Sequence, residues 1–348
     1  MPATIKDIAR QAEVSHSTVS RALRGNPLIS EETAERVRQI ALDMGYHPSA
    51  AARSLKTHQT KALGVVVRNI DDPFFSEILQ GIEDVAVQEG YSIFISSSQN
   101  DGEREQSVVQ AMREHRVDGL IICSTSFSSS QSRLLREDGA PIVVVNNQAA
   151  EEYRYSIHHD DEDGCRQVAR YLIGLGHRRI AYLGNSLSGR TTLDRLAGLQ
   201  QELQAAGLPL PEEYIRQAPG GGPEHGAAAL EQILSLKKRP TALVCFNDMM
   251  AIGVLKGLQR AGIAVPEQCS VTGFDNIVYS AYTSPALTTF DQPKKYIGSE
   301  AARLVLELLR GQPATGIDEM KSGFTRTLQG RLLVRESCAP PLNRDENP

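Results

Sequence analysis

Near the start of the chain, a short run of residues carries side chains that can hydrogen-bond to DNA. Ser17, Thr18 and Ser20 supply hydroxyl groups, and Arg21 supplies a guanidinium group. A hydroxyl can bond to a phosphate oxygen, and a guanidinium group can bond either to a phosphate or to the edge of a guanine. The run therefore predicts contact with nucleic acid, provided that it lies on an element that can enter a groove.

Three short helices are predicted to position this run. Thr4 can cap a first helix with an apolar stripe from Ile5 to Ala12, and a tight turn at 13–15 follows it. Ser15 can cap a second helix over 16–23, and a third is predicted over 30–44. Two helices joined by so tight a turn have the geometry of a helix-turn-helix, whose second helix lies in the major groove with its N-terminal residues at base edges.

From residue 62 onward, apolar segments of strand length alternate with amphipathic helical segments. This α/β pattern predicts parallel sheets covered by helices on both faces, and about nine strands predict two lobes. Ligands of such sheets bind beyond the carboxyl ends of the strands. The predicted strands are 63–67, 92–96, 119–123, 142–145, 180–184, 242–246 and 270–274, and the predicted helices are 75–89, 103–115, 129–138, 163–175, 191–206, 224–236, 248–261 and 295–310.

Residues just after these strands are the candidates for a pocket. Phe74 and Phe75 follow the first strand, where an aromatic face can stack on a sugar or a base, and Asn146 ends the fourth strand. For Phe75, a place in the core at the start of a helix is an equally good interpretation. These side chains favour a polyhydroxylated or planar ligand.

Patterns that would indicate catalysis or a metal centre are missing. Gly220–Gly221–Gly222 lacks the ending of a phosphate-binding loop, and no nucleophile elbow or dinucleotide-binding pattern is present. His158, His159, Asp160 and Asp161 are adjacent in sequence, so that neighbouring side chains point apart. The five cysteines are scattered with no Cys-x-x-Cys pair, which predicts buried thiols. We therefore expect no catalytic residue, no metal and no cofactor.

Composition and charge narrow the class of protein further. With 348 residues, 41% of them hydrophobic and 23% charged, the chain has the composition of a globular protein of more than one domain. No apolar run could span a bilayer, and residues 1–6 lack a signal segment, so a cytoplasmic protein without membrane contact is expected. Residues 1–61 carry nine Lys and Arg against six Asp and Glu, whereas the rest carries 28 against 36, which favours contact with a polyanion only at the N-terminal end.

Two segments of the sequence resemble a known family. The run T-I-K-D-I-A-R-Q-A-E-V-S-H-S-T-V-S-R-A-L, followed by Y-H-P-S-A-A-A-R-S-L-K, resembles the headpiece and hinge of the lactose-repressor (LacI/GalR) family of transcription regulators, with a hinge most similar to that of purine repressors. The similarity continues through L-G-H-R-R-I, R-L-A-G, F-N-D, G-F-D and L-T-T, in the order of the family's effector domain.

The final residues of the chain, 339–348, are polar and proline-rich, which predicts a frayed tail. The resemblance divides the rest of the chain into three parts. Residues 1–48 would be the helix-turn-helix headpiece, and 49–61 a hinge helix and linker. Residues 62–338 would be a two-lobed effector-binding and dimerisation domain, like a periplasmic binding protein. The resemblance also implies a homodimer on a pseudo-palindromic operator of double-stranded DNA, with the protein located at the bacterial nucleoid.

The resemblance also assigns roles in DNA binding. His16 and Ser17 would begin the recognition helix and read bases. In the hinge, which folds as a helix only on DNA in this family, Leu55 would wedge into the minor groove while Ala52 allows close approach and Lys56 faces phosphate. The implied DNA-contacting residues are Thr4, His16, Ser17, Thr18, Ser20, Arg21, Asn26, Ala52, Leu55 and Lys56.

In the second domain, the resemblance implies an effector pocket. Arg195, Asn247 and Asp275 match positions that hydrogen-bond effector, and Asp160 and Thr191 are weaker matches. Lys294 would contact a phosphate or carboxylate on the ligand, or else be solvated. The implied pocket residues are Phe74, Phe75, Asn146, Asp160, Thr191, Arg195, Asn247, Asp275 and Lys294.

These observations favour a ligand-responsive transcription regulator, most simply a repressor with a small sugar or sugar derivative as allosteric effector. A phosphosugar, sugar acid or purine acting as corepressor, or regulation by a protein partner, is the alternative. An exported sugar-binding protein would need an export signal and no helix-turn-helix, and an enzyme would need a catalytic motif.

Overall fold

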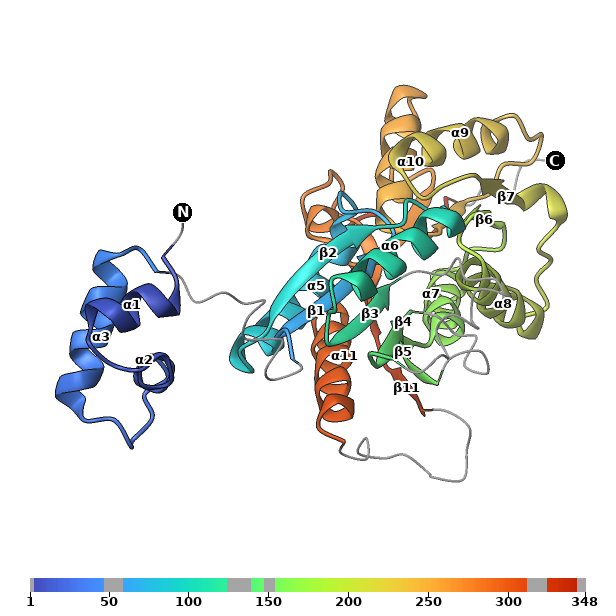
Figure 1. Ribbon diagram of the computed structural model, residues 1–348. Helices are drawn as coiled ribbons and strands as arrows, with labels where there is room; N and C mark the ends of the chain where they lie inside the picture. Colours follow the sequence, from blue (N-terminus) through green and yellow to red (C-terminus); the bar gives the residue numbers. More distant parts are fainter. Residues whose placement is uncertain (1–2, 47–58, 124–138, 147–153, 312–323, 343–348) are drawn as a thin grey trace. The chain divides into compact units, whose positions relative to one another are not determined.

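The computed structural model describes residues 3–46, 59–123, 139–146, 154–311 and 324–342. The chain forms two compact units, residues 1–60 and residues 61–348 (Figure 1). Each unit has its own hydrophobic core.

The first unit contains the three predicted helices. They are α1 (Ile5–Gln11), α2 (His16–Ala22) and α3 (Glu31–Asp43). Thr4 caps α1 in a reciprocal arrangement with Asp7, and the Ser15 Oγ atom accepts a hydrogen bond of 3.1 Å from the backbone N–H of Thr18 at the start of α2. Apolar side chains from all three helices form one small core, which confirms the helix-turn-helix geometry predicted from the periodicity.

The second unit contains two six-stranded sheets, which define an N-terminal lobe and a C-terminal lobe. The N-terminal lobe has the strand order β11-β5-β4-β3-β1-β2 and is parallel throughout. The C-terminal lobe has the order β12-β10-β9-β8-β6-β7 and is parallel except for β12, which runs antiparallel to β10. The strands are β1 (Ala62–Val67), β2 (Ser92–Ser97), β3 (Gly119–Cys123), β4 (Ile142–Val145), β5 (Tyr155–His159), β6 (Ile180–Asn185), β7 (Ile215–Ala218), β8 (Ala242–Cys245), β9 (Ser270–Asp275), β10 (Thr288–Asp291), β11 (Phe324–Leu328) and β12 (Arg331–Leu333).

Helices cover both sheets, as the parallel topology requires. The helices are α5 (Pro73–Gln88), α6 (Gly102–Glu114), α7 (Asp161–Gly174), α8 (Arg190–Ala205), α9 (Pro223–Leu234), α10 (Asp248–Arg260) and α11 (Lys294–Leu309), with short 3₁₀ turns η1 (Glu212–Tyr214) and η2 (Val278–Ala281). Helix α11, although late in the sequence, packs against α5 in the N-terminal lobe, where the two backbones come so close that a Cβ on Gly81 would lie 2.0 Å from the Lys295 carbonyl oxygen.

The chain passes between the two lobes three times. It crosses between β5 and α7, between β10 and α11, and between β11 and β12. Residues in these crossings are the only covalent links between the sheets in the described part of the chain. A change in the relative orientation of the lobes must therefore be absorbed there.

The seven predicted strands agree with the structure to within one residue, and seven of the eight predicted helices agree to within two. The helix predicted over 129–138 lies outside the described residues. Five strands, β5, β7, β10, β11 and β12, were not predicted. They are short and rich in polar residues, as in the Y-S-I-H-H of β5, so they lack the apolar run that indicates a buried strand.

The predicted frayed tail is wrong at its beginning. The Ala339 N–H donates to the Ser270 hydroxyl at 3.1 Å, and the Ala339 carbonyl oxygen lies 3.1 Å from the His177 Nε2 atom. His177 also lies 2.9 Å from the Thr241 hydroxyl oxygen through Nδ1. Buried polar partners, which a proline-rich sequence does not reveal, thus hold the chain beyond the predicted boundary.

We expect His177 to make the second unit sensitive to acid. Burial lowers the pKa of His177 to about 4, below the ordinary value of 6.5. As the pH falls below 6.5, the unfolded chain binds a proton that the folded chain does not, so the free energy of unfolding decreases by about 2 kcal/mol at pH 4.5. Urea unfolding at pH 7.5 and 4.5 should show that His177→Gln loses less stability on acidification than the unaltered protein. The exposed His115→Gln is the control, and equal losses in all three proteins would contradict this role.

Candidate functional site

Helix α2 presents a polar surface in the first unit. His16, Ser17 and Arg21 are exposed, whereas Val19, between them, is fully buried in the small core. The Ser20 hydroxyl accepts a hydrogen bond of 2.7 Å from the Arg24 guanidinium group, which adds a second arginine to this surface. The helix therefore presents hydroxyl, imidazole and guanidinium groups outward while its apolar side anchors it, as a recognition helix requires.

Other predicted DNA-contacting residues also have structural roles. Thr4 is the N-cap of α1, and the hydroxyl groups of Ser15 and Thr18 lie 2.8 Å apart at the start of α2. The Asn26 Oδ1 atom accepts a hydrogen bond from the Leu28 N–H at 3.0 Å. Ala52, Leu55 and Lys56 lie outside the described residues, so their roles at the hinge stay predictions.

In the second unit, a cavity of about 350 Å³ lies among the carboxyl ends of strands from both sheets. Seven of the nine predicted pocket residues line it, and two do not. Those lining it are Phe74, Phe75, Asn146, Thr191, Arg195, Asn247 and Asp275. Both interpretations of Phe75 hold, because it packs in the N-terminal core and also lines the cavity. Phe74 does the same, and the two ring centroids are 5.2 Å apart.

Arg195 is the centre of a buried polar network in this pocket. Its Nε atom donates to the Asp161 Oδ1 atom at 2.7 Å, and its Nη1 atom donates to the carbonyl oxygen of Phe246. The guanidinium group lies 3.8 Å from the ring centroid of Phe274, and its Nη2 atom lies 3.7 Å from the Asp275 Oδ1 atom. These contacts occupy two of the five N–H donors of Arg195 with hydrogen bonds and hold its guanidinium plane against Phe274 and Asp275.

The carboxyl groups on either side of Arg195 have different electrostatic environments. Burial acts to raise the pKa of Asp161, but His159, with Nε2 at 2.9 Å, and Arg195 outweigh it and lower the pKa to about 2. Burial raises the pKa of Asp275 well above its ordinary value, and Arg195 opposes that shift. Asp161 is thus the firmly ionised partner of Arg195, whereas the carboxyl group of Asp275 is harder to ionise than an exposed one.

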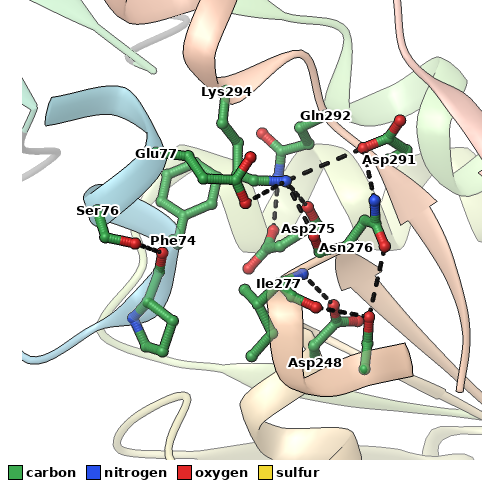
Figure 2. Close-up of polar contacts among 12 residues, drawn as sticks. Phe74, Ser76, Glu77, Asp248, Asp275, Asn276, Ile277, Asp291, Gln292 and Lys294 are labelled. Atoms are coloured by element: carbon green, nitrogen blue, oxygen red, sulfur yellow. Dashed lines mark hydrogen bonds and ion pairs between the residues drawn. The ribbon is translucent and has the colours of Figure 1, made fainter. Parts of the chain in front are cut away.

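The structure corrects two predicted pocket residues. Asp160 does not line the cavity, because its Oδ1 atom caps α7 by accepting a hydrogen bond of 2.8 Å from the Asp163 N–H. The neighbouring Asp161 faces the pocket instead. Lys294 is neither at the cavity nor solvated. Its Nζ atom is buried and donates to the carbonyl oxygens of Asp275 and Asn276 behind the pocket wall (Figure 2).

Several pocket residues were not predicted from the sequence. Arg68 follows β1 and donates from Nη1 to the Ser188 hydroxyl oxygen at 3.3 Å, which links the two lobes across the cleft. Asn100 also lines the cavity, and Gly221 lies so close to Asn247 that a Cβ there would be 2.9 Å from the amide nitrogen. The three consecutive glycines were the sequence signal that could have identified this part of the pocket wall. Glycine lets the backbone approach a ligand closely, and this does not require a phosphate loop.

The pocket wall is rich in hydrogen-bond acceptors and in negative charge. It contains five carboxyl side chains against two guanidinium groups, namely Asp71, Asp72, Asp161, Glu224 and Asp275 against Arg68 and Arg195. The Oδ1 atoms of Asn100 and Asn146 are buried and have no hydrogen-bond partner among the described residues. Such acceptors are stabilised by a ligand that donates hydrogen bonds to them.

A second hollow of about 470 Å³ lies outside the pocket, on the N-terminal lobe. It is bounded by the edge strand β2 and by α6, and its lining includes Phe94, Val108 and Met112. Phe94 is 56% exposed and its neighbour Ile95 is 43% exposed. Large apolar side chains on the edge strand of a sheet are unusual on a free surface.

The described residues contain no group of three or more His, Cys, Asp or Glu side chains placed to hold a metal ion. None of the helices among them is long and apolar enough to cross a membrane.

Both units of the chain match known protein families. Residues 4–49 match the model of bacterial regulatory proteins of the lacI family, and residues 169–338 match the model of a periplasmic binding protein-like domain. The chain is 36% identical over 339 residues to the HTH-type transcriptional repressor PurR of Klebsiella pneumoniae (strain 342), with 97% of each chain covered. It is also 36% identical to PurR of Vibrio parahaemolyticus, with 88% of this chain and 92% of that protein covered.

Solved structures agree with these matches. The lac repressor dimer bound to operator and the anti-inducer ONPF has a TM-score of 0.86 at 27% identity, and covers 97% of this chain and 100% of that one. The complex of the transcriptional regulator CelR with cellobiose has a TM-score of 0.71 at 26% identity, and the alignment covers 96% of this chain and 99% of that chain.

A helix-turn-helix unit joined to a two-lobed domain with a polar interlobe pocket defines a DNA-binding repressor that responds to a small molecule. The extent of the sequence and structural similarity specifies the family. The chain belongs to the LacI family of bacterial regulatory proteins.

Proposed function

We propose that this protein is a repressor that binds a pseudo-palindromic operator as a homodimer and responds to a small uncharged sugar as its allosteric effector. We place its action in the cytoplasm, at the nucleoid. The observation that carries the choice of effector is the pocket wall, in which carboxyl groups outnumber guanidinium groups and two buried amide oxygens lack partners.

The polarity of this wall favours a neutral ligand with many hydroxyl groups. A sugar hydroxyl can donate to a carboxylate or amide oxygen, and the Phe74 and Phe75 rings can cover a sugar face. An anionic effector is disfavoured because the guanidinium group of Arg195 is already bonded to Asp161 and to the carbonyl oxygen of Phe246. A phosphosugar or sugar acid would bring a further negative charge to a wall that already carries an excess.

A purine acting as corepressor is the second candidate. It is supported by the PurR relatives and by the aromatic residues Phe74, Phe75 and Phe246 in the pocket wall, which suit a planar base. A purine also carries N–H donors for the acceptors of the wall. Regulation by a protein partner is a third candidate, to be considered if no small molecule binds.

For the dimer, we infer an interface that includes Phe94 and Ile95 on β2. The exposed apolar side chains and the hollow against α6 suit a second copy of this chain, and the lac repressor structure that the chain resembles is a dimer. A two-fold dimer presents the same surface twice and matches the symmetry of a pseudo-palindromic operator.

Effector and operator are then coupled through the orientation of the lobes. A ligand that binds one orientation more tightly shifts the population toward it, and the DNA affinity changes by the same factor by which DNA changes the affinity for the ligand. An effector that weakens DNA binding is an inducer, whereas one that strengthens it is a corepressor.

The test uses two measurements on the purified protein. A duplex is first selected from a random library and its affinity is measured between 50 and 200 mM salt, where specific binding should weaken at least about tenfold through counterion release. Thermal shift is then measured with D-ribose, cellobiose, glucose 6-phosphate, gluconate and hypoxanthine. A shift with a neutral sugar alone supports the proposal, and a shift with hypoxanthine alone establishes the second candidate. Failure to select any duplex would contradict the DNA-binding function.

A further inference from the structure

The side chain of Lys294 has an unusual position for a lysine. It is the first residue of α11, directly after the second crossing between the lobes, and its side chain is 1% exposed. An ammonium group in such a place costs several kcal/mol unless it is fully hydrogen-bonded. Its partners must therefore keep their positions as long as the lysine stays buried and charged.

Those partners come from both lobes. The Nζ atom donates to the carbonyl oxygen of Asp275 and, at 3.1 Å, to that of Asn276, at the end of β9 in the C-terminal lobe. It also lies 3.4 Å from the Glu77 Oε1 atom on α5 in the N-terminal lobe. Figure 2 shows the ammonium group between these acceptors, with Asp291 farther away at 3.9 Å.

The two carbonyl groups belong to residues with an uncommon backbone conformation. Asp275 has a φ of 112° and Asn276 a φ of 52°, so both lie in the left-handed region that non-glycine residues rarely adopt. This conformation needs support from the surroundings, and Lys294 supplies it through both carbonyl oxygens. The side chain of Asp275 faces the pocket from the same residue, and Gln292, also in the crossing, donates to its Oδ1 atom at 2.5 Å.

We propose that Lys294 is a positioning residue that couples the pocket wall at Asp275 to the orientation of α5 in the opposite lobe. Rotation of the lobes separates Glu77 from the two carbonyl groups, which leaves the buried ammonium group with fewer acceptors. The contact therefore favours the lobe orientation of this structure. The inference rests on the proposed function only in that it takes the cavity to be the effector pocket.

The chain offers a matched control in the adjacent residue. Lys295 also joins α11 to α5, through a contact of 2.8 Å between its Nζ atom and the Asp84 Oδ2 atom, but both side chains are about half exposed. Glu77 and Asp84 are seven residues apart and thus lie on the same face of α5. An exposed pair of this kind contributes little, so Lys295→Met and Asp84→Asn should leave lobe orientation unchanged.

The test is hydrogen–deuterium exchange of the full chain without DNA or effector. Two peptides are followed. One contains the amides of Asn276 and Ile277, next to the pocket residue Asp275 in the C-terminal lobe, and the other contains those of Phe74 and Phe75, which line the pocket in the N-terminal lobe. Lys294→Met should speed exchange in both peptides at least tenfold, and Glu77→Gln should do so at least threefold in the second peptide. Lys295→Met and Asp84→Asn should remain within twofold of the unaltered protein.

Faster exchange confined to the Asn276 peptide, in both Lys294→Met and Glu77→Gln, would show a purely local role and overturn the coupling. Rates in the Lys294 and Glu77 variants that match those of the Lys295 and Asp84 variants would also overturn it. If Lys294→Met does not fold, the Glu77→Gln measurement decides, because Glu77 is 42% exposed on its side chain and tolerates replacement. No ligand is used, so this result is independent of the thermal-shift screen.

Discussion

Arg195→Met is expected to abolish the response to effector and to lower the free energy of unfolding by about 3–5 kcal/mol. The substitution removes the guanidinium group from a site where its side chain is 5% exposed and leaves the carboxylate of Asp161, 3% exposed, without this partner. Breaking a buried ion pair by removing one partner has a cost of this size, because the remaining charge stays buried. The pocket wall also loses the group that fixes the Phe246 carbonyl oxygen and faces Asp275.

The control for this prediction is Arg170→Met. Arg170 also forms an ion pair between helices, with its Nη2 atom 2.6 Å from the Glu202 Oε1 atom, but its side chain is 58% exposed. Its loss should change the free energy of unfolding far less than the loss of Arg195 does, because an exposed ion pair contributes little, and it should leave the effector response intact. Urea unfolding and thermal shift with the ligand panel measure both properties. A normal ligand response in Arg195→Met, or equal destabilisation by the two variants, would contradict the central role of Arg195.

The fold was predictable wherever a segment carries its own signal. The apolar runs of β1, β3 and β4 and the periodicity of the helices identify these elements without knowledge of their neighbours. Strand β5 was missed because its two histidines are stabilised only by tertiary contacts, such as that between the His158 Nε2 atom and the Thr327 hydroxyl oxygen at 3.1 Å on β11.

For single side chains of the pocket, too, the sequence predicts only what does not depend on distant parts of the chain. Arg195 and Asp275 were found by resemblance, and their types alone predict hydrogen bonding. For Lys294, the sequence gives a lysine beside another lysine at the start of a helix, which is typical of a solvated pair. Whether such a residue is buried depends on two carbonyl oxygens from residues 275 and 276, which are brought to it by the sheet of the other lobe. Long-range packing of this kind has no local sequence signal.

The double variant Phe94→Glu/Ile95→Glu is expected to yield a monomer that binds the selected operator at least about 100-fold more weakly. An isologous interface contains each substitution twice, so four carboxylates would be placed against apolar surface. Each desolvated, unpaired charge costs more than about 1 kcal/mol, so the four together weaken the association of the two copies by at least about a thousandfold. A monomer binds only one half-site. In a dimer, binding of one DNA-binding unit holds the second unit at a high effective concentration near the other half-site, and the monomer loses this advantage.

Light scattering and operator titration measure these two effects, and ligand-induced thermal shift shows whether the monomer keeps its pocket. Leu193→Glu is the control, because Leu193 is 60% exposed on α8 of the C-terminal lobe and is not part of the β2 surface. It should remain a dimer with unchanged operator affinity. A double variant that stays dimeric would place the interface elsewhere, whereas a monomer with undiminished operator affinity would show that the two half-sites are not bound together. Both effects should occur in the same variant, because the affinity for a pseudo-palindromic operator follows from the two-fold symmetry of the dimer.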